Sequence, residues 1–253
     1  MFLTHRKDSL FYTCEDKDHP DFICVFSNRN FNYDLRAAES REESGAVIRA
    51  RKALLEKFGL DLERAVFLQQ VHGARIAFLH SPVFRRGGFA YTEGLEGTDA
   101  AITDLKNVPL CLLSADCLPV FFFSPRPKVI GIAHAGWKGT GSGIVSAVIE
   151  KMTTDFGCRP DEVKVGFGPG IRSCCYEVGV EFKKYFSAQS IVEKESRLFL
   201  DLAAENVRRL IAAGVKRINI FDAKICTACE NNEFFSYRRG DGKNRMLTIV
   251  CRT

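Results

Sequence analysis

The chain has 253 residues, of which 46% are hydrophobic and 26% are charged, and its formal net charge is +5 at pH 7. This composition is typical of a globular domain and excludes wholesale disorder and collagen-like structure. The 36 basic and 31 acidic residues are spread along the chain, which argues against a nucleic-acid partner and is compatible with a small anionic substrate.

The N-terminal segment has no apolar stretch of signal-peptide length. The longest apolar runs, such as residues 118–123, are far shorter than the ~20 residues that cross a bilayer. We therefore expect a cytoplasmic protein with no membrane partner. No linker divides the sequence, so residues 1–253 are expected to form a single domain, with about residues 1–20 as a poorly defined arm.

Amphipathic periodicity predicts three helices. The first has an apolar face from Val47 to Phe58 and stops at Gly59. The second covers residues 144–156 and is closed by a glycine. Asp201 is a suitable N-cap for the third, which ends at Gly214.

Short apolar runs of strand length lie at residues 22–26, 65–68, 75–79, 100–103, 110–113, 118–123, 129–133, 163–167 and 217–221. A further run at residues 246–251 is interpreted as an edge strand. The block from Asp99 to Ala133 contains four strands and no helix, whereas the remainder alternates helix and strand. We therefore expect an α/β (α+β) fold, a single layered domain with a mixed central sheet and flanking helices.

Three polar segments follow or interrupt these strands, and they contain His72, Cys117 and His134. Two histidines and one cysteine can bind zinc and leave the fourth tetrahedral position for water, as in catalytic sites. The same side chains also fit two other interpretations. Cys117 could be a thiolate nucleophile with His134 as its base, or all three could be packing residues.

The histidine count excludes a four-copper centre. The chain has five histidines, whereas a multicopper oxidase needs roughly ten because imidazole is the main copper ligand.

The ten cysteines are too few for a disulfide scaffold and are expected to be mostly reduced thiols. Cys226 and Cys229 form a Cys-x-x-Cys pair, but a zinc ribbon needs a second such pair, which the sequence lacks. We interpret the pair as structural. Cys174 and Cys175 are adjacent, so we expect them to point to different sides and to serve in packing.

Five motifs occur in order along the chain: QVHG (70–73), TDA (98–100) with SADCLPV (114–120), AHAGWKG (133–139), GPGI…CCYEVG (168–179) and CTAC…FFSYRR (226–239). In these motifs the chain resembles the family labelled "laccase domain" or multicopper polyphenol oxidoreductase. Its members are described as purine nucleoside phosphorylases with adenosine deaminase activity, and some bacterial members as peptidoglycan editing factors. The resemblance extends from about Cys24 onward.

The resemblance implies a metal site and a fold. The family's zinc ligands correspond to His72, Cys117 and His134, so the implied cofactor is Zn²⁺, with Cu²⁺ possible at the same site. The implied fold is a layered α/β domain similar to that of toxin-deamidase-like cysteine hydrolases. The implied substrates are a small-molecule nucleoside and phosphate.

Further candidate residues lie in or near the matched motifs. Asp99 and Asp116 are candidates for the acid/base role. The candidates for phosphate and substrate binding are Arg29, Lys138, Arg238, Arg239 and Gln70.

The chain also departs from the family pattern. Lys138 stands where arginine is usual, and Arg172 and Asn244 stand where glycine is usual. These departures leave substrate preference and phosphate binding open.

The expected function is zinc-dependent phosphorolysis of adenosine, inosine or methylthioadenosine, together with hydrolytic deamination of adenosine. Two alternatives use the same residues, a peptidoglycan-precursor editing hydrolase and a metal-free Cys–His hydrolase. A non-enzymatic binding protein would leave the His–Cys–His set without a purpose. The oligomeric state stays open.

Overall fold

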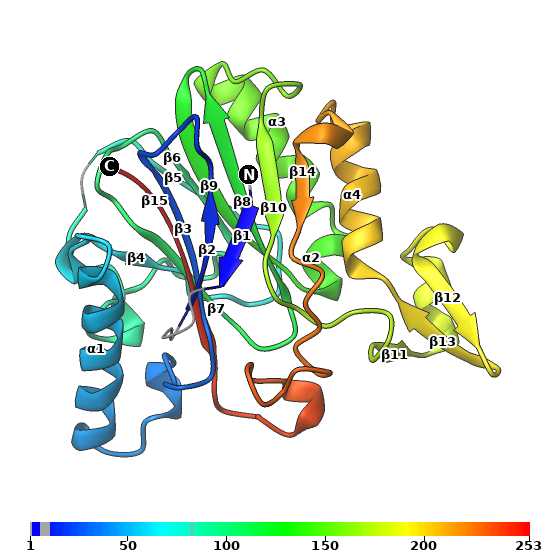
Figure 1. The fold of residues 1–253 in the computed structure, drawn as a ribbon, viewed down its shortest axis with the longest axis horizontal. Coiled ribbons are helices and arrows are strands. Elements are labelled where there is room, and N and C mark those ends of the chain that lie inside the picture. The colour runs from blue at the N-terminus through cyan, green and yellow to red at the C-terminus, as the bar shows by residue number, and fades with distance from the viewer. Residues whose placement is uncertain (1, 6–10, 82) are drawn as a thin grey trace.

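Two six-stranded sheets pack face to face in the computed structural model, which describes residues 2–5, 11–81 and 83–253 (Figure 1). The first sheet has the order β1 (Phe2–His5), β2 (Phe11–Glu15), β3 (Phe22–Ser27), β15 (Met246–Arg252), β7 (Leu110–Ser114) and β4 (Val66–Phe67). The second has the order β14 (Ile220–Asp222), β10 (Lys164–Phe167), β8 (Leu118–Pro125), β9 (Lys128–Ala135), β6 (Ala100–Thr103) and β5 (Ile76–Leu79).

Both large sheets are mixed. β4 pairs in parallel with β7, β5 with β6 and β10 with β14, and the other pairings are antiparallel. A small antiparallel sheet contains β11 (Glu177–Val178), β13 (Arg197–Leu200) and β12 (Ile191–Lys194), and it projects from the side of the molecule in Figure 1. The α/β class with mixed sheets is confirmed.

The expectation of one central sheet is wrong. The consecutive strands β7 and β8 belong to different sheets, and the chain turns from one sheet to the other between Ser114 and Leu118. The assignment of residues 246–251 to an edge is also wrong, because β15 lies between β3 and β7. Its residues 246–251 are all buried, as expected of an interior strand.

The side chains of β8 show how the layers are filled. Phe121 and Phe123 point into the core between the two sheets, whereas Val120 and Phe122 point into the core on the helix side. This alternation follows from the two-residue period of a strand. Because both faces of β8 are covered, its sequence is apolar almost throughout.

Helices cover the outer faces of the two sheets. α1 (Arg41–Glu56) packs on the first sheet, and α3 (Ile144–Phe156) and α4 (Leu202–Ala212) pack on the second (Figure 1). The three predicted helices are confirmed, and Asp201 caps α4 by accepting a hydrogen bond from the N–H of Ala204 at 2.8 Å. The short helix α2 (Trp137–Gly141) follows β9 directly.

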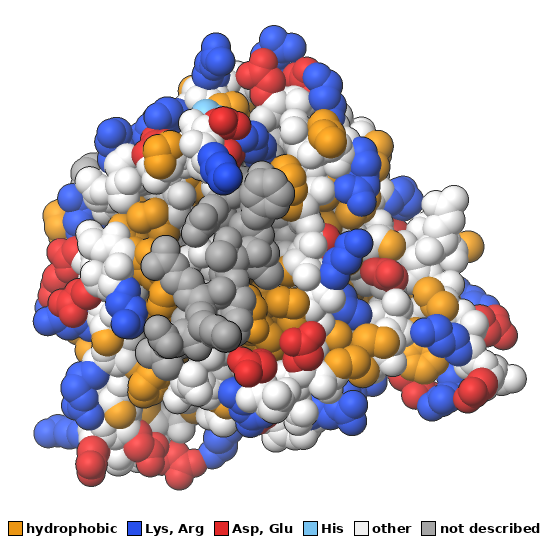
Figure 2. Space-filling model, viewed as in Figure 1, with side chains coloured by type: hydrophobic (Ala, Val, Ile, Leu, Met, Phe, Trp, Pro, Cys, Tyr) orange, Lys and Arg blue, Asp and Glu red, His pale blue; other side chains and the backbone are white. Residues whose placement is uncertain are grey.

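The N-terminal arm expected over about residues 1–20 falls partly outside the described residues, and the single-domain organisation stays a prediction. Across the described ranges, no helix has the length and apolar character needed to span a membrane. Basic and acidic side chains are interspersed on the face shown in Figure 2.

Gly166 is a position where only glycine fits between two strands. It lies opposite Phe121 in the β10–β8 pairing, and a Cβ atom there would come within 2.0 Å of the Phe121 ring. We expect Gly166→Ala to reduce the free energy of unfolding by about 1–3 kcal/mol, because the ring must leave its place in the core. Thermal denaturation of this variant measures the effect. Gly242→Ala is the control, because a Cβ atom there would have no neighbour within 4 Å. Equal melting temperatures would contradict it.

Glu205 of α4 is fully buried and accepts hydrogen bonds from Ser187, Ser190, Arg208 and Arg209. Burial raises the pKa of this carboxyl, but the hydrogen bonds, foremost that from Arg208, lower it to about 2. Because the folded-state pKa lies below the unfolded one, the ionised carboxyl stabilises the fold fully above about pH 5, and this contribution is lost as the pH falls toward 2.

We therefore expect Glu205→Gln to lower the free energy of unfolding at pH 7 by up to about 3 kcal/mol. The difference in free energy of unfolding between the variant and the native protein should become smaller below about pH 5. Denaturant unfolding at several pH values measures this difference. Glu150→Gln, at an exposed site on α3, is the control. If the variant were destabilised equally at pH 3 and pH 7, the ionised carboxylate would not be the cause of the destabilisation.

Candidate functional site

His72, Cys117 and His134 meet where the chain passes from the first sheet to the second. His72 lies in the loop after β4, Cys117 in the turn between β7 and β8, and His134 near the end of β9. One ligand atom from each lies within 4.8 Å of the others. The structure therefore brings together the three residues that the sequence singled out.

The carboxylate of Asp99, the residue directly before β6, organises this cluster. Its Oδ1 accepts a hydrogen bond from the N–H of His72 at 3.0 Å, and its Oδ2 accepts from the N–H groups of Gly73 at 2.7 Å and Val71 at 3.2 Å. Burial raises the pKa of Asp99, but the contact with His134 and the hydrogen bonds from Gly73 and Val71 lower it, so the carboxyl is held ionised.

Asp99 also fixes the ring of His134. Oδ1 of Asp99 lies 2.9 Å from Nδ1 of His134, which leaves Nε2 free to face Cys117 or a metal. Burial lowers the pKa of His134, but the charges of Cys117 and Asp99 raise it. In turn, burial raises the pKa of Cys117, but the charge of His134 and hydrogen bonds from both histidines lower it. Cys117 is thus poised as a thiolate, the form that binds metals and attacks carbon.

Two site residues have a backbone conformation that side chains rarely adopt. Asp116 has a φ of 83° and His72 a φ of 62°. Such strain persists only where the surroundings enforce it, and it concentrates at functional sites. At Asp116 the surroundings are specific, since Oδ1 accepts from Thr227 Oγ1 at 2.6 Å and Oδ2 accepts from the N–H of Arg238 at 2.7 Å.

Gly136, directly after β9, leaves space beside the sulfur of Cys117. A Cβ atom at this position would lie 2.8 Å from Cys117 Sγ and 3.4 Å from a ring carbon of His72. The backbone therefore approaches Cys117 and His72 closely, and only glycine leaves the space beside these two side chains clear. This supports a fit between the three donors and a metal ion.

The cluster opens into a cavity of about 500 Å³. This volume lies within the range of small-molecule sites. Its basic lining residues are Arg36, Lys138, Arg238 and Arg245, and its acidic one is Asp116. Trp137, Tyr176 and Tyr237 contribute aromatic surface. The cavity therefore offers positive charge and ring faces next to the His–Cys–His donors.

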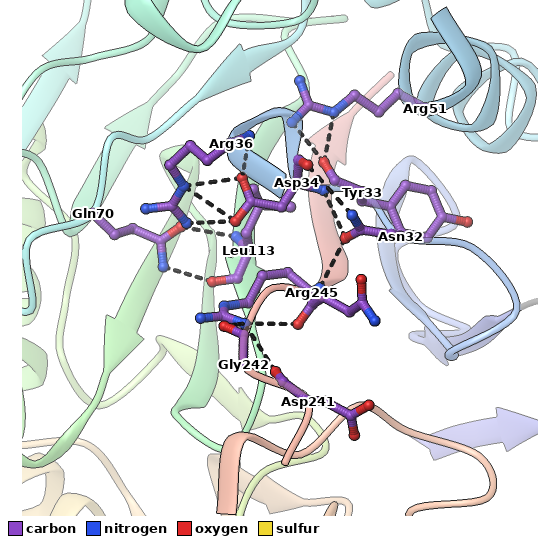
Figure 3. Close-up of polar contacts among 11 residues, drawn as sticks. Asn32, Tyr33, Asp34, Arg36, Arg51, Gln70, Leu113, Asp241, Gly242 and Arg245 are labelled. Carbon is purple, nitrogen blue, oxygen red and sulfur yellow. Dashed lines mark hydrogen bonds and ion pairs between the residues drawn. The ribbon is translucent and has the colours of Figure 1, made fainter. Parts of the chain in front are cut away.

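Three of the five predicted binding residues line this cavity, namely Gln70, Lys138 and Arg238. The side-chain amide of Gln70 donates to the carbonyl of Leu113 at 2.7 Å and accepts from its N–H at 2.9 Å, so it supports the wall (Figure 3). Lys138 is exposed, with its ammonium group 5.5 Å from the centre of the Trp137 ring.

Arg29 and Arg239 are not among the lining residues. The guanidinium of Arg29 bonds to Asp241 at 3.2 Å and to the carbonyl of Asn231. That of Arg239 donates to the carbonyl of Ala228 at 2.9 Å. Both arginines stabilise the C-terminal loops instead of facing the cavity.

Sequence reasoning missed Arg36 and Arg245, which line the cavity from distant parts of the chain. Arg36 is held by both carboxylate oxygens of Asp34, and Arg245 donates to carbonyl oxygens of its own loop (Figure 3). The spacing of Asp34 and Arg36, two residues apart in the sequence, could have indicated that ion pair. Nothing local marks Arg245.

The structure also gathers four cysteines in a second cluster. The sulfurs of Cys174 and Cys175 both lie 3.4 Å from that of Cys229, and Cys226 completes the group. The expectation that Cys174 and Cys175 point to different sides is wrong. Alternation applies to strands, whereas these residues lie in a turn closed by the hydrogen bond from the N–H of Cys175 to the carbonyl of Arg172.

Comparisons with known proteins agree with this architecture. The family model for the multi-copper polyphenol oxidoreductase laccase matches residues 26–253. Purine nucleoside phosphorylase YlmD of Geobacillus stearothermophilus is 34% identical over 88% of this chain and 84% of its own. Adenosine deaminase RL5 from an unknown prokaryotic organism is 35% identical over 81% of this chain and 82% of its own. The crystal structure of Bacillus licheniformis hypothetical protein YfiH superposes with a TM-score of 0.91 at 30% identity, covering 98% of each chain.

Asp99→Asn tests the role of the organising carboxylate. An amide cannot accept the hydrogen bonds that both oxygens receive, so His134 and the loop of His72 lose their fixed orientation. If the cluster holds a metal ion, its affinity for added zinc should fall by about 10–100-fold, the usual effect of removing the partner of a ligating histidine. Competition with a chelator measures it, and Asp104→Asn, at an exposed site after β6, is the control. Unchanged zinc affinity would contradict the assignment.

Proposed function

Because the chain belongs to the multi-copper polyphenol oxidoreductase laccase family, whose relatives include proteins named purine nucleoside phosphorylase and adenosine deaminase, we propose that it is a zinc-dependent purine nucleoside enzyme. The proposed reactions are phosphorolysis of adenosine, inosine or methylthioadenosine and hydrolytic deamination of adenosine. The observation that carries the proposal is the His72–Cys117–His134 cluster at a cavity lined by basic and aromatic side chains.

His72, Cys117 and His134 would hold the zinc ion. Two imidazoles and a thiolate are a donor set that zinc favours, and the carboxylate of Asp99 presents His134 in the required orientation. A bound zinc ion would supply Lewis acidity at the floor of the cavity. Copper could occupy the same three donors, but a four-copper oxidase centre would need more histidines than the five in the chain.

The basic lining supports phosphate as a co-substrate. Lys138, Arg238 and Arg245 join Arg36 around the cavity, against the single carboxylate of Asp116. Guanidinium groups bind tetrahedral anions with paired hydrogen bonds, and Arg36 is already oriented by Asp34. Lys138 keeps the positive charge of the usual arginine but cannot form paired hydrogen bonds, and arginines elsewhere on the cavity wall offset that loss.

The two aspartates have different roles in this proposal. Asp99 is saturated by backbone N–H groups and His134, so we assign it as a positioning residue. Asp116 lines the cavity, although it is only 8% exposed, and it is the better candidate for proton transfer to or from a bound purine. Its hydrogen bonds from Thr227 and Arg238 aim the carboxylate.

Aromatic side chains would bind the base. Trp137, Tyr176 and Tyr237 line the cavity, and ring faces stack on purines. Tyr176 packs against the guanidinium of Arg238, whose carbon lies 5.2 Å from the ring centre. That contact keeps the ring of Tyr176, a candidate base-binding residue, next to Arg238, a candidate phosphate-binding residue.

A metal-free hydrolase is a second candidate because Cys117, His134 and Asp99 form a chain of the kind found in cysteine hydrolases. The sulfur lies beside one nitrogen of the imidazole and the carboxylate lies 2.9 Å from the other. A peptidoglycan-precursor editing hydrolase would use the same residues on nucleotide-linked muramyl peptides.

We expect Cys117→Ala to abolish zinc binding at this cluster and to lower nucleoside turnover by at least ~100-fold, because both proposed reactions depend on this donor. The assay supplies adenosine, inosine and methylthioadenosine with and without phosphate, and follows purine and ammonia release. Cys158→Ala, at a buried cysteine outside both cysteine-containing clusters, is the control.

The outcomes separate the candidates. Phosphate-dependent release of purine supports phosphorolysis, and ammonia release from adenosine supports deamination. Metal binding without nucleoside turnover would favour the editing hydrolase. Cys117-dependent hydrolysis by a protein that binds no metal at His72, Cys117 and His134 would overturn the zinc mechanism.

A further inference from the structure

We propose that Cys174, Cys175, Cys226 and Cys229 bind a second zinc ion, as a structural tetrathiolate site behind the wall of the cavity. This inference does not depend on the proposed enzymatic function, because it rests on a separate set of donors. The four sulfurs lie within 4.8 Å of one another.

The spacing of the sulfurs fits zinc. A tetrahedral ion with Zn–S bonds of about 2.3 Å places its sulfurs ~3.8 Å apart. The observed separations bracket this value, from 3.4 Å for the Cys174–Cys229 and Cys175–Cys229 pairs to a limit of 4.8 Å. They are well beyond the ~2.05 Å of a disulfide bond.

The backbone is arranged to bring two separate segments to the cluster. Gly170 and Cys226 form a β-bridge, and the guanidinium of Arg172 donates to the carbonyl of Ile225 at 3.1 Å. This places the turn of Cys174 and Cys175 beside the Cys-x-x-Cys segment. The adjacent pair thus supplies the two sulfurs that a second Cys-x-x-Cys motif provides in a zinc ribbon.

The turn around Cys226 also suits a metal-bound thiolate. The N–H of Glu230 donates to the carbonyl of Cys226 at 3.0 Å, which closes the turn, and N–H groups of Ala228 and Cys229 form hydrogen bonds with the Cys226 sulfur. Hydrogen bonds of this kind stabilise metal-bound sulfur. Arg239, bound to the carbonyl of Ala228, brings positive charge beside a site that would carry a net charge of −2.

The site would stiffen the substrate cavity. Thr227, between the two cysteines of the motif, donates to Asp116, and Tyr176, directly after Cys175, lines the cavity. Zinc binding would release the four thiol protons and lock these two segments together. Cys226 is buried whereas Cys174 and Cys229 are exposed, so an ion could enter from solvent.

Metal analysis of the whole chain, purified with reductant and zinc, tests the proposal. We expect two zinc ions per native chain, one in Cys229→Ser, one in Cys117→Ala, and two in the control Cys158→Ala. Retention of two ions by Cys229→Ser would overturn the proposal. So would a single ion in the native protein that Cys117→Ala removes.

X-ray absorption on Cys117→Ala examines the second site by itself and keeps the test valid if Cys229→Ser fails to fold. We expect four sulfur neighbours at about 2.3 Å from zinc. A mixture of nitrogen and sulfur neighbours, iron in place of zinc, or a disulfide among the four cysteines in the reduced protein would overturn the assignment. A fall in the melting temperature of the native protein on chelation, still seen in Cys117→Ala, would support it.

Discussion

The carboxylate of Asp99 joins three parts of the fold at the candidate site. Asp99 directly precedes β6, accepts backbone hydrogen bonds from residues 71–73 after β4, and holds the ring of His134 on β9. His72 follows β4 of the first sheet and His134 lies on β9 of the second, so the geometry of the two histidines depends on how the sheets are packed. A buried ion that receives four hydrogen bonds fixes this geometry, because leaving any donor unpaired in the interior would be costly.

Asp116, directly before Cys117 in the chain, performs a similar task. It occupies the corner at which the chain leaves the first sheet, in a left-handed backbone conformation. Thr227 and Arg238 hold its carboxylate, and both lie in the C-terminal loops that follow β14. Cys117 therefore directly follows one anchored carboxylate and meets His134, which the other carboxylate holds. Through Thr227, Asp116 is also connected to the Cys226–Cys229 segment of the four-cysteine cluster. The left-handed backbone of Asp116 is thus held by hydrogen bonds from residues that lie more than a hundred positions further along the chain.

Local patterns gave reliable predictions where one physical cause dominates. Helical periodicity, Asp201 as a cap and Gly157 as a stop fixed the ends of α3 and α4 to within two residues. Apolar runs located most strands, but not their partners, since pairing is decided by contacts far apart in sequence. β15 illustrates this, because an apolar run that closes the chain reads as an edge although it lies between β3 and β7.

Sequence alone determined the family resemblance, the residue types of the site and the exclusion of a four-copper centre, since each depends only on which residues are present. It also identified Asp99 without distinguishing an acid/base from a positioning role. The tertiary structure decided that Arg36 and Arg245 line the cavity while Arg29 and Arg239 do not. It also decided that Cys174 and Cys175 meet Cys226 and Cys229. These arrangements arise from a turn, a bridge between loops and the packing of two sheets, and none of these leaves a periodic signal in the sequence.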